Sequence, residues 1–173
     1  MHHRRTFLLT SFAVALSTSL PALADDVTYD KLFFIKRSKN ANEVHYDARV
    51  TKAGTLDPKE PMVGYWINKA EDGSRSSITT LQKIAYGYDC DQTKDGQSWQ
   101  LKLKAFKERP MWVVKSDAGK WRVRTTIAGK DAYMKHLYVA TDESGMIPKV
   151  LYVDVFGEEI AGGAAIQEHI VKN

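Results

Sequence analysis

The residue types that bind metals or act as nucleophiles are few and widely spaced in this sequence. After the N-terminal segment the only histidines are His45, His136 and His169, and no pair has the i, i+4 spacing that zinc sites usually show. The single cysteine, Cys90, stands between two aspartates, whose charge disfavours the thiolate that nucleophilic attack requires. Neither a Gly-x-Ser-x-Gly elbow nor a glycine loop for phosphates or dinucleotides occurs. The sequence therefore predicts no catalytic residue, no metal site and no cofactor.

A mixed polar and aromatic set could instead bind a small ligand. Its donors lie in and around one tight turn, and its rings could form the wall of a pocket, which is how small-molecule sites combine many apolar groups with few polar ones. The alternative is that Asn40 and Asn42 only build the turn, because asparagine tolerates left-handed backbone and bonds to its own main chain. The candidate ligand-binding residues are Arg37, Asn40, Asn42, His45, Tyr65, Trp66 and Tyr86.

A second candidate is a basic surface for an anionic partner. Residues 100–135 carry ten basic and three acidic residues. If the strands of this region are neighbours, their alternate basic residues share one solvent-facing side and would attract lipid headgroup phosphates or envelope polymers. An outer sheet face guarded by lysines explains the same pattern without a partner. Nucleic acid is not expected as a partner, since the net charge is small. The candidate contacts are Lys102, Lys104, Arg122 and Arg124.

The elements that must position these residues are mostly strands, because hydrophobicity alternates with period two after residue 30. In residues 43–50, Val44, Tyr46 and Ala48 lie on one face, and together with the apolar run 32–37 this segment predicts a β-hairpin. Residues 77–86 change to helical spacing, with a Thr79/Gln82 pair compatible with a capping box. The pattern predicts a mainly all-β fold, an antiparallel barrel or sandwich of about eight strands with one short inserted helix. The period of the last segment, 164–171, stays unassigned.

The N-terminus has the three parts of a secretory signal peptide. Residues 1–5 are basic, residues 6–20 are apolar, and Ala22-Leu23-Ala24 forms a small-x-small cleavage site. The apolar segment is shorter than the about 20 residues of a membrane span and contains several hydroxyl residues, so no membrane span is expected. The pair Arg4-Arg5 before Thr-Phe-Leu resembles the twin-arginine pattern, although ordinary signals also carry arginine pairs. We expect cleavage near Ala24 and a periplasmic or secreted product.

Composition agrees with one globular domain over residues 25–173. The chain is 43% hydrophobic and 27% charged, which excludes a disordered protein. Loss of Arg4 and Arg5 with the signal leaves the remaining chain only weakly basic. The lone cysteine excludes an intramolecular disulfide, and nothing in the sequence predicts the oligomeric state.

Several stretches resemble a known family. The segment from Phe34 to Tyr46 resembles the opening motif of a family of small exported bacterial proteins known as domain of unknown function 4833. Later stretches fit the same pattern: Gly54–Pro61 with Tyr65-Trp66-Ile67, Leu81–Gly87, and Val150–Val153 followed by Gly157. Met62-Val63-Gly64 departs from it, since the family looks more like Val-His-Val there. The resemblance implies an exported single domain over residues 31–171 and no known activity.

The expected function is a non-catalytic binding module for a small amphipathic molecule or an anionic component of the cell envelope. The alternatives are a cell-envelope hydrolase with a scattered site and a protein that docks through a sheet edge. A deep cavity lined by tyrosines and tryptophans would favour the binding module. A cleft that joins His45 or His136 to a carboxylate would favour the enzyme. A filled interior with a long uncovered edge strand would favour docking.

Overall fold

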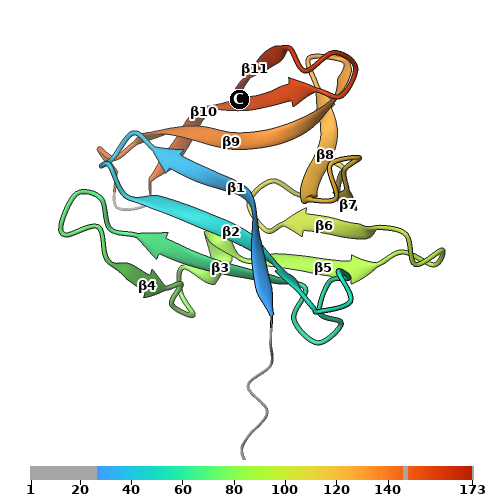
Figure 1. The fold of residues 1–173 in the computed structure, drawn as a ribbon. Helices are drawn as coiled ribbons and strands as arrows, with labels where there is room; N and C mark the ends of the chain where they lie inside the picture. Colours follow the sequence, from blue (N-terminus) through green and yellow to red (C-terminus); the bar gives the residue numbers. More distant parts are fainter. Residues whose placement is uncertain (1–26, 146–147, 173) are drawn as a thin grey trace, which may run out of the picture.

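The chain forms eleven β-strands and one helical turn in the computed structural model, which describes residues 27–145 and 148–172 (Figure 1). The elements are β1 (Thr28–Arg37), β2 (Glu43–Val50), β3 (Met62–Ile67), β4 (Arg75–Ser77), α1 (Lys83–Tyr86), β5 (Tyr88–Gln92), β6 (Trp99–Leu103), β7 (Met111–Lys115), β8 (Trp121–Ile127), β9 (Lys130–Asp142), β10 (Lys149–Glu159) and β11 (Ala165–Val171).

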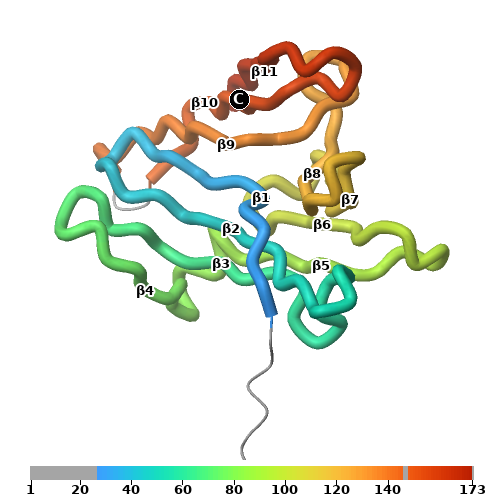
Figure 2. The backbone as a smooth tube through the Cα atoms, viewed as in Figure 1, coloured from blue at the N-terminus to red at the C-terminus, as the bar shows by residue number. Residues whose placement is uncertain are grey.

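All the strands belong to one curled sheet. Nine of them follow the order β4-β3-β2-β1-β9-β8-β7-β6-β5, and β10 with β11 extends the sheet from β9. The strands that are neighbours in this order pair antiparallel, except that residues 34–37 of β1 run parallel to residues 136–139 of β9. The sheet curls into an open half-barrel, visible in the path of the backbone (Figure 2).

The long strand β9 is where the sheet forks. Its first part, residues 130–134, pairs with β8, and residues 136–139 pair with β1. Asp30 of β1 bridges the fork, because its carboxylate accepts hydrogen bonds from the Trp121 N–H and the Lys120 ammonium of the other branch, each at 3.0 Å. One side chain thus ties the first strand to the start of β8.

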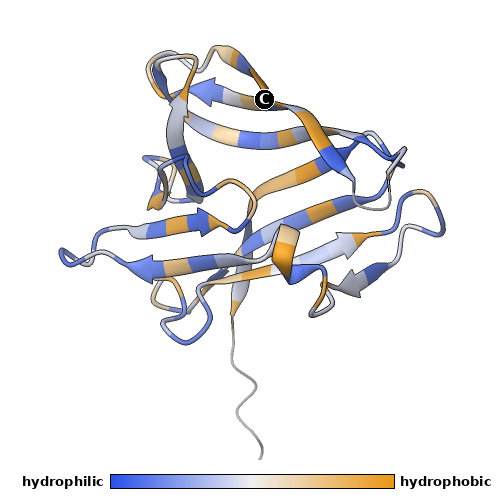
Figure 3. Ribbon diagram, turned by 180° about the vertical axis from the view of Figure 1, so that it is seen from behind, coloured by the Kyte–Doolittle hydropathy of each residue, from blue (hydrophilic) through white to orange (hydrophobic). Residues whose placement is uncertain are grey.

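Alternate residues of each strand form the core inside the curl. Val44, Tyr46 and Ala48 of β2 are fully buried, as the period-two pattern predicts, and Val123 and Ile127 of β8 are equally inaccessible. The stripes of apolar and polar residues along the strands are visible in Figure 3. Because burial of apolar surface contributes about 25 cal/mol per Å², this filled interior is the main stabilising element of the fold.

The two ends of the sheet approach each other without pairing. No ladder joins β3 to β5 in the described part of the chain, and α1 lies between them (Figure 3). Two tyrosines bridge this seam: the Tyr46 hydroxyl donates to the Tyr86 carbonyl at 2.8 Å, and the Tyr88 hydroxyl donates to the Met62 carbonyl at 2.6 Å. At the seam, side-chain hydrogen bonds connect the two sheet ends, and the backbone ladder that would close the barrel is missing from the described residues.

The mainly all-β prediction with one short helix is confirmed, and two finer expectations are wrong. The sheet is neither a closed barrel nor a sandwich, because the seam interrupts its ladder, and it has eleven strands where about eight were expected. The additional strands include β4, only three residues long, and β11, the segment whose period was unassigned. The reciprocal Thr79/Gln82 bonds of the expected capping box form, but only Lys83–Tyr86 is helical, and Leu81 and Ile84 remain exposed.

The predicted signal peptide, residues 1–24, lies outside the described residues. Within them, no helix has the length and apolar character needed to span a membrane.

Candidate functional site

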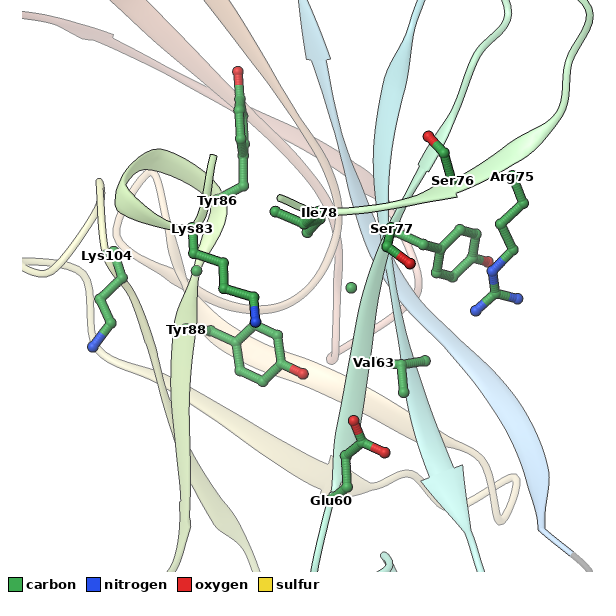
Figure 4. A pocket seen from close by; sticks show the side chains of 13 residues that line it. Glu60, Val63, Arg75, Ser76, Ser77, Ile78, Lys83, Tyr86, Tyr88 and Lys104 are labelled. Atoms are coloured by element: carbon green, nitrogen blue, oxygen red, sulfur yellow. The ribbon is translucent and has the colours of Figure 1, made fainter. Parts of the chain in front are cut away.

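A cavity of about 620 Å³ occupies the seam between β3–β4 and α1–β5, and we call it the seam pocket (Figure 4). It lies where no ladder joins the two sheet ends, because β3 pairs only with β2 and β4, and β5 only with β6, in the described residues. Its lining residues are Glu60, Val63, Gly64, Tyr65, Arg75, Ser76, Ser77, Ile78, Lys83, Tyr86, Gly87, Tyr88 and Lys104.

The charges around the seam pocket are unbalanced. Three basic residues, Arg75, Lys83 and Lys104, line it against the single carboxylate of Glu60. Glu60 is itself ion-paired with Arg49. Positive charge with little compensation attracts small anions to a concave site.

Among the three basic side chains, Lys83 has the most freedom to bind. Lys104 pairs with Asp89 at 2.6 Å, and the Arg75 guanidinium lies 3.3 Å from the centre of the Tyr65 ring. Lys83 is exposed, and its ammonium makes no ion pair or hydrogen bond within the described part of the chain. In Figure 4 this side chain extends over the cavity towards the Tyr88 ring.

Two tyrosines of the pocket, the buried Tyr65 and the half-buried Tyr88, stay protonated at neutral pH. Burial and the negative charge of Glu60 raise the pKa of Tyr88 to about 12. Burial and a 2.7 Å hydrogen bond to Asp47 raise the pKa of Tyr65 to about 12. Both hydroxyls already donate to protein acceptors. They therefore shape the pocket and do not act as bases.

The seven predicted ligand-binding residues fall into three places. Tyr65 and Tyr86 line the seam pocket. His45 does not line it, and it shares the outer face, the face turned away from the core, with its cross-strand partner Tyr65. Tyr65 and Trp66 are adjacent in β3, so their side chains point to opposite faces of the sheet. This alternation follows from the strand period in the sequence, and it places the two rings on opposite sides of the sheet. Arg37, Asn42 and Trp66 line a second hollow, and Asn40 lies beside it, hydrogen-bonded to Arg37 and Asn42.

This second hollow, the Arg37 hollow, lies next to the seam pocket on the other side of β4. Its volume is about 360 Å³, and its lining residues are Arg37, Asn42, Trp66, Asn68, Glu71, Ser76, Ser77, Thr79 and Gln82. Ser76 and Ser77 line both cavities.

The asparagines of the predicted site hold the turn between β1 and β2. Asn40 accepts a hydrogen bond from the Asn42 N–H at 3.2 Å and another from Arg37 at 2.9 Å. The buried Asn42 side chain accepts the Ala70 N–H at 2.8 Å. Both asparagines therefore help to build the turn, which is the alternative to a role in ligand binding. Asn42 also borders the Arg37 hollow.

The four predicted basic residues do not form one continuous stripe. Lys102, Lys104 and Arg124 are exposed and Arg122 is half-buried. Lys102 lies in β6 and Lys104 just after it, and β7 separates β6 from β8, the strand of the two arginines. Arg124 pairs with Asp131 at 2.6 Å, and Arg122 lies 4.9 Å from the centre of the Tyr133 ring. Lys104 lines the seam pocket, whereas the other three residues of this set lie outside it.

The sequence reasoning missed Glu60, Arg75 and Lys83. These residues belong to a loop, a three-residue strand and a helical turn, and none carries a motif. Their shared position depends on which sheet ends meet, a property that no local pattern signals.

Histidine–carboxylate contacts are present but do not form a catalytic constellation. His45 Nε2 lies 2.8 Å from the buried Glu43 carboxylate, which also pairs with Lys69 at 2.7 Å. No hydroxyl or thiol in the described residues hydrogen-bonds to His45, and burial together with Asp91 raises the pKa of Cys90 to about 12. The described residues also include no cluster of three or more side chains suited to a metal ion.

Comparison with known proteins places the chain in a family without assigning an activity. Neither the curated proteins nor the solved structures include a match. One family model, described as "Domain of unknown function (DUF4833)", matches residues 33–169. This range covers most of the chain and contains every strand that borders the seam pocket. The chain therefore belongs to the DUF4833 family, as the resemblance of its motifs indicates.

Proposed function

We propose that the domain is a non-catalytic binding module that takes up a small anionic, partly apolar molecule in the seam pocket. The observation that carries this proposal is the excess of cations over carboxylates around a cavity of about 620 Å³. Ligand sites for small molecules have volumes of about 300–1,000 Å³ and few, well-placed polar groups. The seam pocket is of this size.

The ligand's expected chemistry follows from the two kinds of wall. Lys83, free of protein partners within the described residues, would bind a phosphate or carboxylate group by a charge-assisted hydrogen bond. Val63 and Ile78 offer an apolar surface for a short hydrocarbon part. An amphipathic anion satisfies both walls, whereas a neutral polar molecule would leave Lys83 uncompensated.

A hydrolase is the less supported alternative. Ser76 and Ser77 line the seam pocket, but they lie across the cavity from Lys83 in Figure 4, and no hydrogen bond within the described residues joins the Lys83 ammonium to either serine. The His45–Glu43 pair borders the outer face, where the His45 ring is stacked between Phe34 and Tyr65 at 5.1 and 5.7 Å. Neither set places a nucleophile beside a base, which acyl transfer requires.

Docking through a sheet edge is a second candidate with its own observation. The core is packed, and among the described residues β11 pairs only with β10, so its other edge has no neighbouring strand there. Its residues include Glu168, and a charged side chain on an edge opposes pairing with another strand. We therefore rank docking below ligand binding.

The place of action in this proposal is outside the cytoplasm, after cleavage near Ala24. Fractionation of producing cells followed by N-terminal sequencing tests it: a mature chain that begins at Asp25 in the periplasm or medium supports export. A cytoplasmic chain that retains Met1 contradicts it.

Native mass spectrometry and calorimetry test the binding function. The mature protein, purified without refolding, is examined for a bound small molecule and then titrated with octyl phosphate and octanoate. Binding of these probes, with about fivefold loss in Lys83→Gln, is the expected result, because an exposed charge-assisted contact contributes about 1 kcal/mol.

Lys102→Gln is the matched control, since this exposed lysine lies on β6 outside the pocket. Equal losses in both variants would reduce the effect to general surface charge. No binding of either probe to the native protein, with no copurified molecule, would contradict the proposal.

A further inference from the structure

Arg37 is a half-buried cation without an anionic partner. Among the described residues its guanidinium donates only to the Asn40 side chain at 2.9 Å and to the Tyr86 hydroxyl at 3.4 Å. Its Nε atom is buried and has no hydrogen-bond partner. The carboxylate of Glu143 interacts electrostatically with Arg37, but its ion pair is with Lys39 at 2.8 Å.

The guanidinium is held in a fixed position. It lies 4.6 Å from the centre of the Trp66 ring, and Trp66 in turn packs edge-to-face on Tyr86 and donates its indole N–H to Gln82 at 3.1 Å. A planar guanidinium preorganised in this way binds carboxylates with little loss of conformational freedom. Two of its five N–H groups are used by the protein.

A carboxylate borders the same hollow. Glu71 is exposed, lines the Arg37 hollow, and its side chain forms no ion pair within the described residues. Arg37 and Glu71 also form no ion pair with each other. The remaining wall consists mainly of amide and hydroxyl side chains, among them Asn42, Asn68 and Thr79. The hollow therefore presents one uncompensated positive group, one uncompensated negative group and neutral polar groups.

We infer that the Arg37 hollow is a second binding site, independent of the seam pocket, and that its ligand is a small zwitterion such as a free amino acid or a short peptide. The ligand's carboxylate is bound by Arg37 and its ammonium by Glu71. The volume of about 360 Å³ admits a molecule of this size and excludes a long chain. A simple anion would leave Glu71 unpaired, and a simple cation would leave Arg37 unpaired.

Titration with matched probes tests the assignment. The probes are L-alanine and the dipeptide Ala-Ala, which carry both charges, propionate, which lacks the ammonium, and ethylamine, which lacks the carboxylate. The chemical shift of the Trp66 indole N–H reports binding next to Arg37. We expect both zwitterions to bind with Kd values near or below about 1 mM, and each single-charge probe to bind at least about tenfold more weakly.

Two variants separate the site from its neighbours. Glu71→Gln changes an exposed residue, so folding is retained, and it should weaken L-alanine about tenfold while leaving propionate unchanged. Arg37→Gln should weaken L-alanine and propionate alike. Arg124→Gln, on the outer face, is the control and should change neither.

The outcomes also separate this inference from the seam-pocket proposal. Propionate binding as tightly as L-alanine, or Glu71→Gln without effect on L-alanine, would overturn the zwitterion assignment. No shift of the Trp66 indole signal with any probe would overturn the site itself. Binding of octyl phosphate that depends on Lys83 would survive all three results, because Lys83 does not line the Arg37 hollow.

Discussion

The outer face of the sheet and the seam between its ends both carry aromatic and charged side chains, but these side chains are arranged differently in the two regions. On the outer face, five rings from β3, β2, β1, β9 and β10 stack in one row, with neighbouring ring centres 4.3 to 5.7 Å apart. In order across the strands, the row consists of Tyr65, His45, Phe34, His136 and Phe156. At the seam, β3 and β5 do not pair, and the side chains between them line a cavity.

The difference shows how strand pairing distributes polar groups. Where a ladder sets neighbouring residues about 5 Å apart, the side chains satisfy one another and leave little for a ligand. Where the ladder stops, as between β3 and β5, side chains such as that of Lys83 in α1 border a cavity and have no protein partner in the described part of the chain. Binding capacity is therefore expected at the seam, and stability is expected to depend on the row of rings.

Phe34→Ala is expected to have the largest effect on this comparison. Phe34 stacks on His45 at 5.1 Å and on His136 at 5.0 Å, so its removal interrupts the row at its centre. We expect a loss of about 2–3 kcal/mol in the free energy of unfolding, measured by urea denaturation, with unchanged octyl phosphate binding by the folded fraction. Tyr29→Ala, at an exposed position of the same strand without a ring contact, is the control and should cost less than about 0.5 kcal/mol. Equal losses of unfolding free energy in the two variants would show that the row of rings does not stabilise the fold more than other side chains of the strand.

Tyr88→Phe should have a smaller effect, located at the seam. It removes the 2.6 Å hydrogen bond to the Met62 carbonyl and should cost about 1 kcal/mol. Amide hydrogen exchange should accelerate in β5 more than in β8, because the lost bond tethers one sheet end. Tyr133→Phe is the control, since the Tyr133 hydroxyl has no hydrogen-bond partner among the described residues. Uniform acceleration throughout the sheet would contradict a local role for Tyr88.

The smallest expected effect is a pH dependence that originates in the row. Burial, helped by the charge of Lys36, lowers the pKa of His136 below its usual value of about 6.5. Below pH 6.5, His136 therefore binds a proton more readily in the unfolded chain than in the native state. The free energy of unfolding should accordingly fall as the pH decreases from that value. Because His136 is partly exposed, the slope should stay well under the limit of about 1.4 kcal/mol per pH unit for one proton.

Urea titrations between pH 7.5 and 5.5 measure this dependence. His136→Gln should flatten the curve relative to the native protein within this range. The lowered pKa of Glu43 acts in a separate, more acidic window, where its loss of ion pairs with Lys69 and His45 destabilises the fold. Identical slopes in the native protein and His136→Gln would exclude His136 as the source.

Local patterns predicted much of the fold. The alternation in residues 43–50 placed Val44 and Tyr46 in the core, and both are fully buried. The stretch Asp117-Ala118-Gly119-Lys120 between two strand patterns predicts a turn with glycine in left-handed backbone, and Gly119 has φ 76°. These features depend on neighbours in the chain, so the sequence reveals them.

The pairing of distant segments could not be predicted in the same way. The parallel contact between β1 and β9 joins Phe34 to His136, and no local signal specifies that partner. The candidate site depends on such contacts, since Arg75, Lys83 and Lys104 come from separate elements. Three of the predicted ligand residues do come into contact: the Arg37 guanidinium stacks on the Trp66 ring, and Trp66 packs on Tyr86. A cation is attracted to an aromatic ring, and this attraction favours the contact between Arg37 and Trp66.

The fork at β9 has a consequence for how the chain folds. Strands β5 to β9 pair with neighbours in sequence order and can assemble by short-range zipping, whereas β1 must wait for a partner about a hundred residues further along the chain. Closing so long a loop costs conformational entropy before any contact is gained. The first hairpin should therefore join last, after β9 has formed, so the nascent N-terminal strands depend on the last third of the polypeptide for their native place.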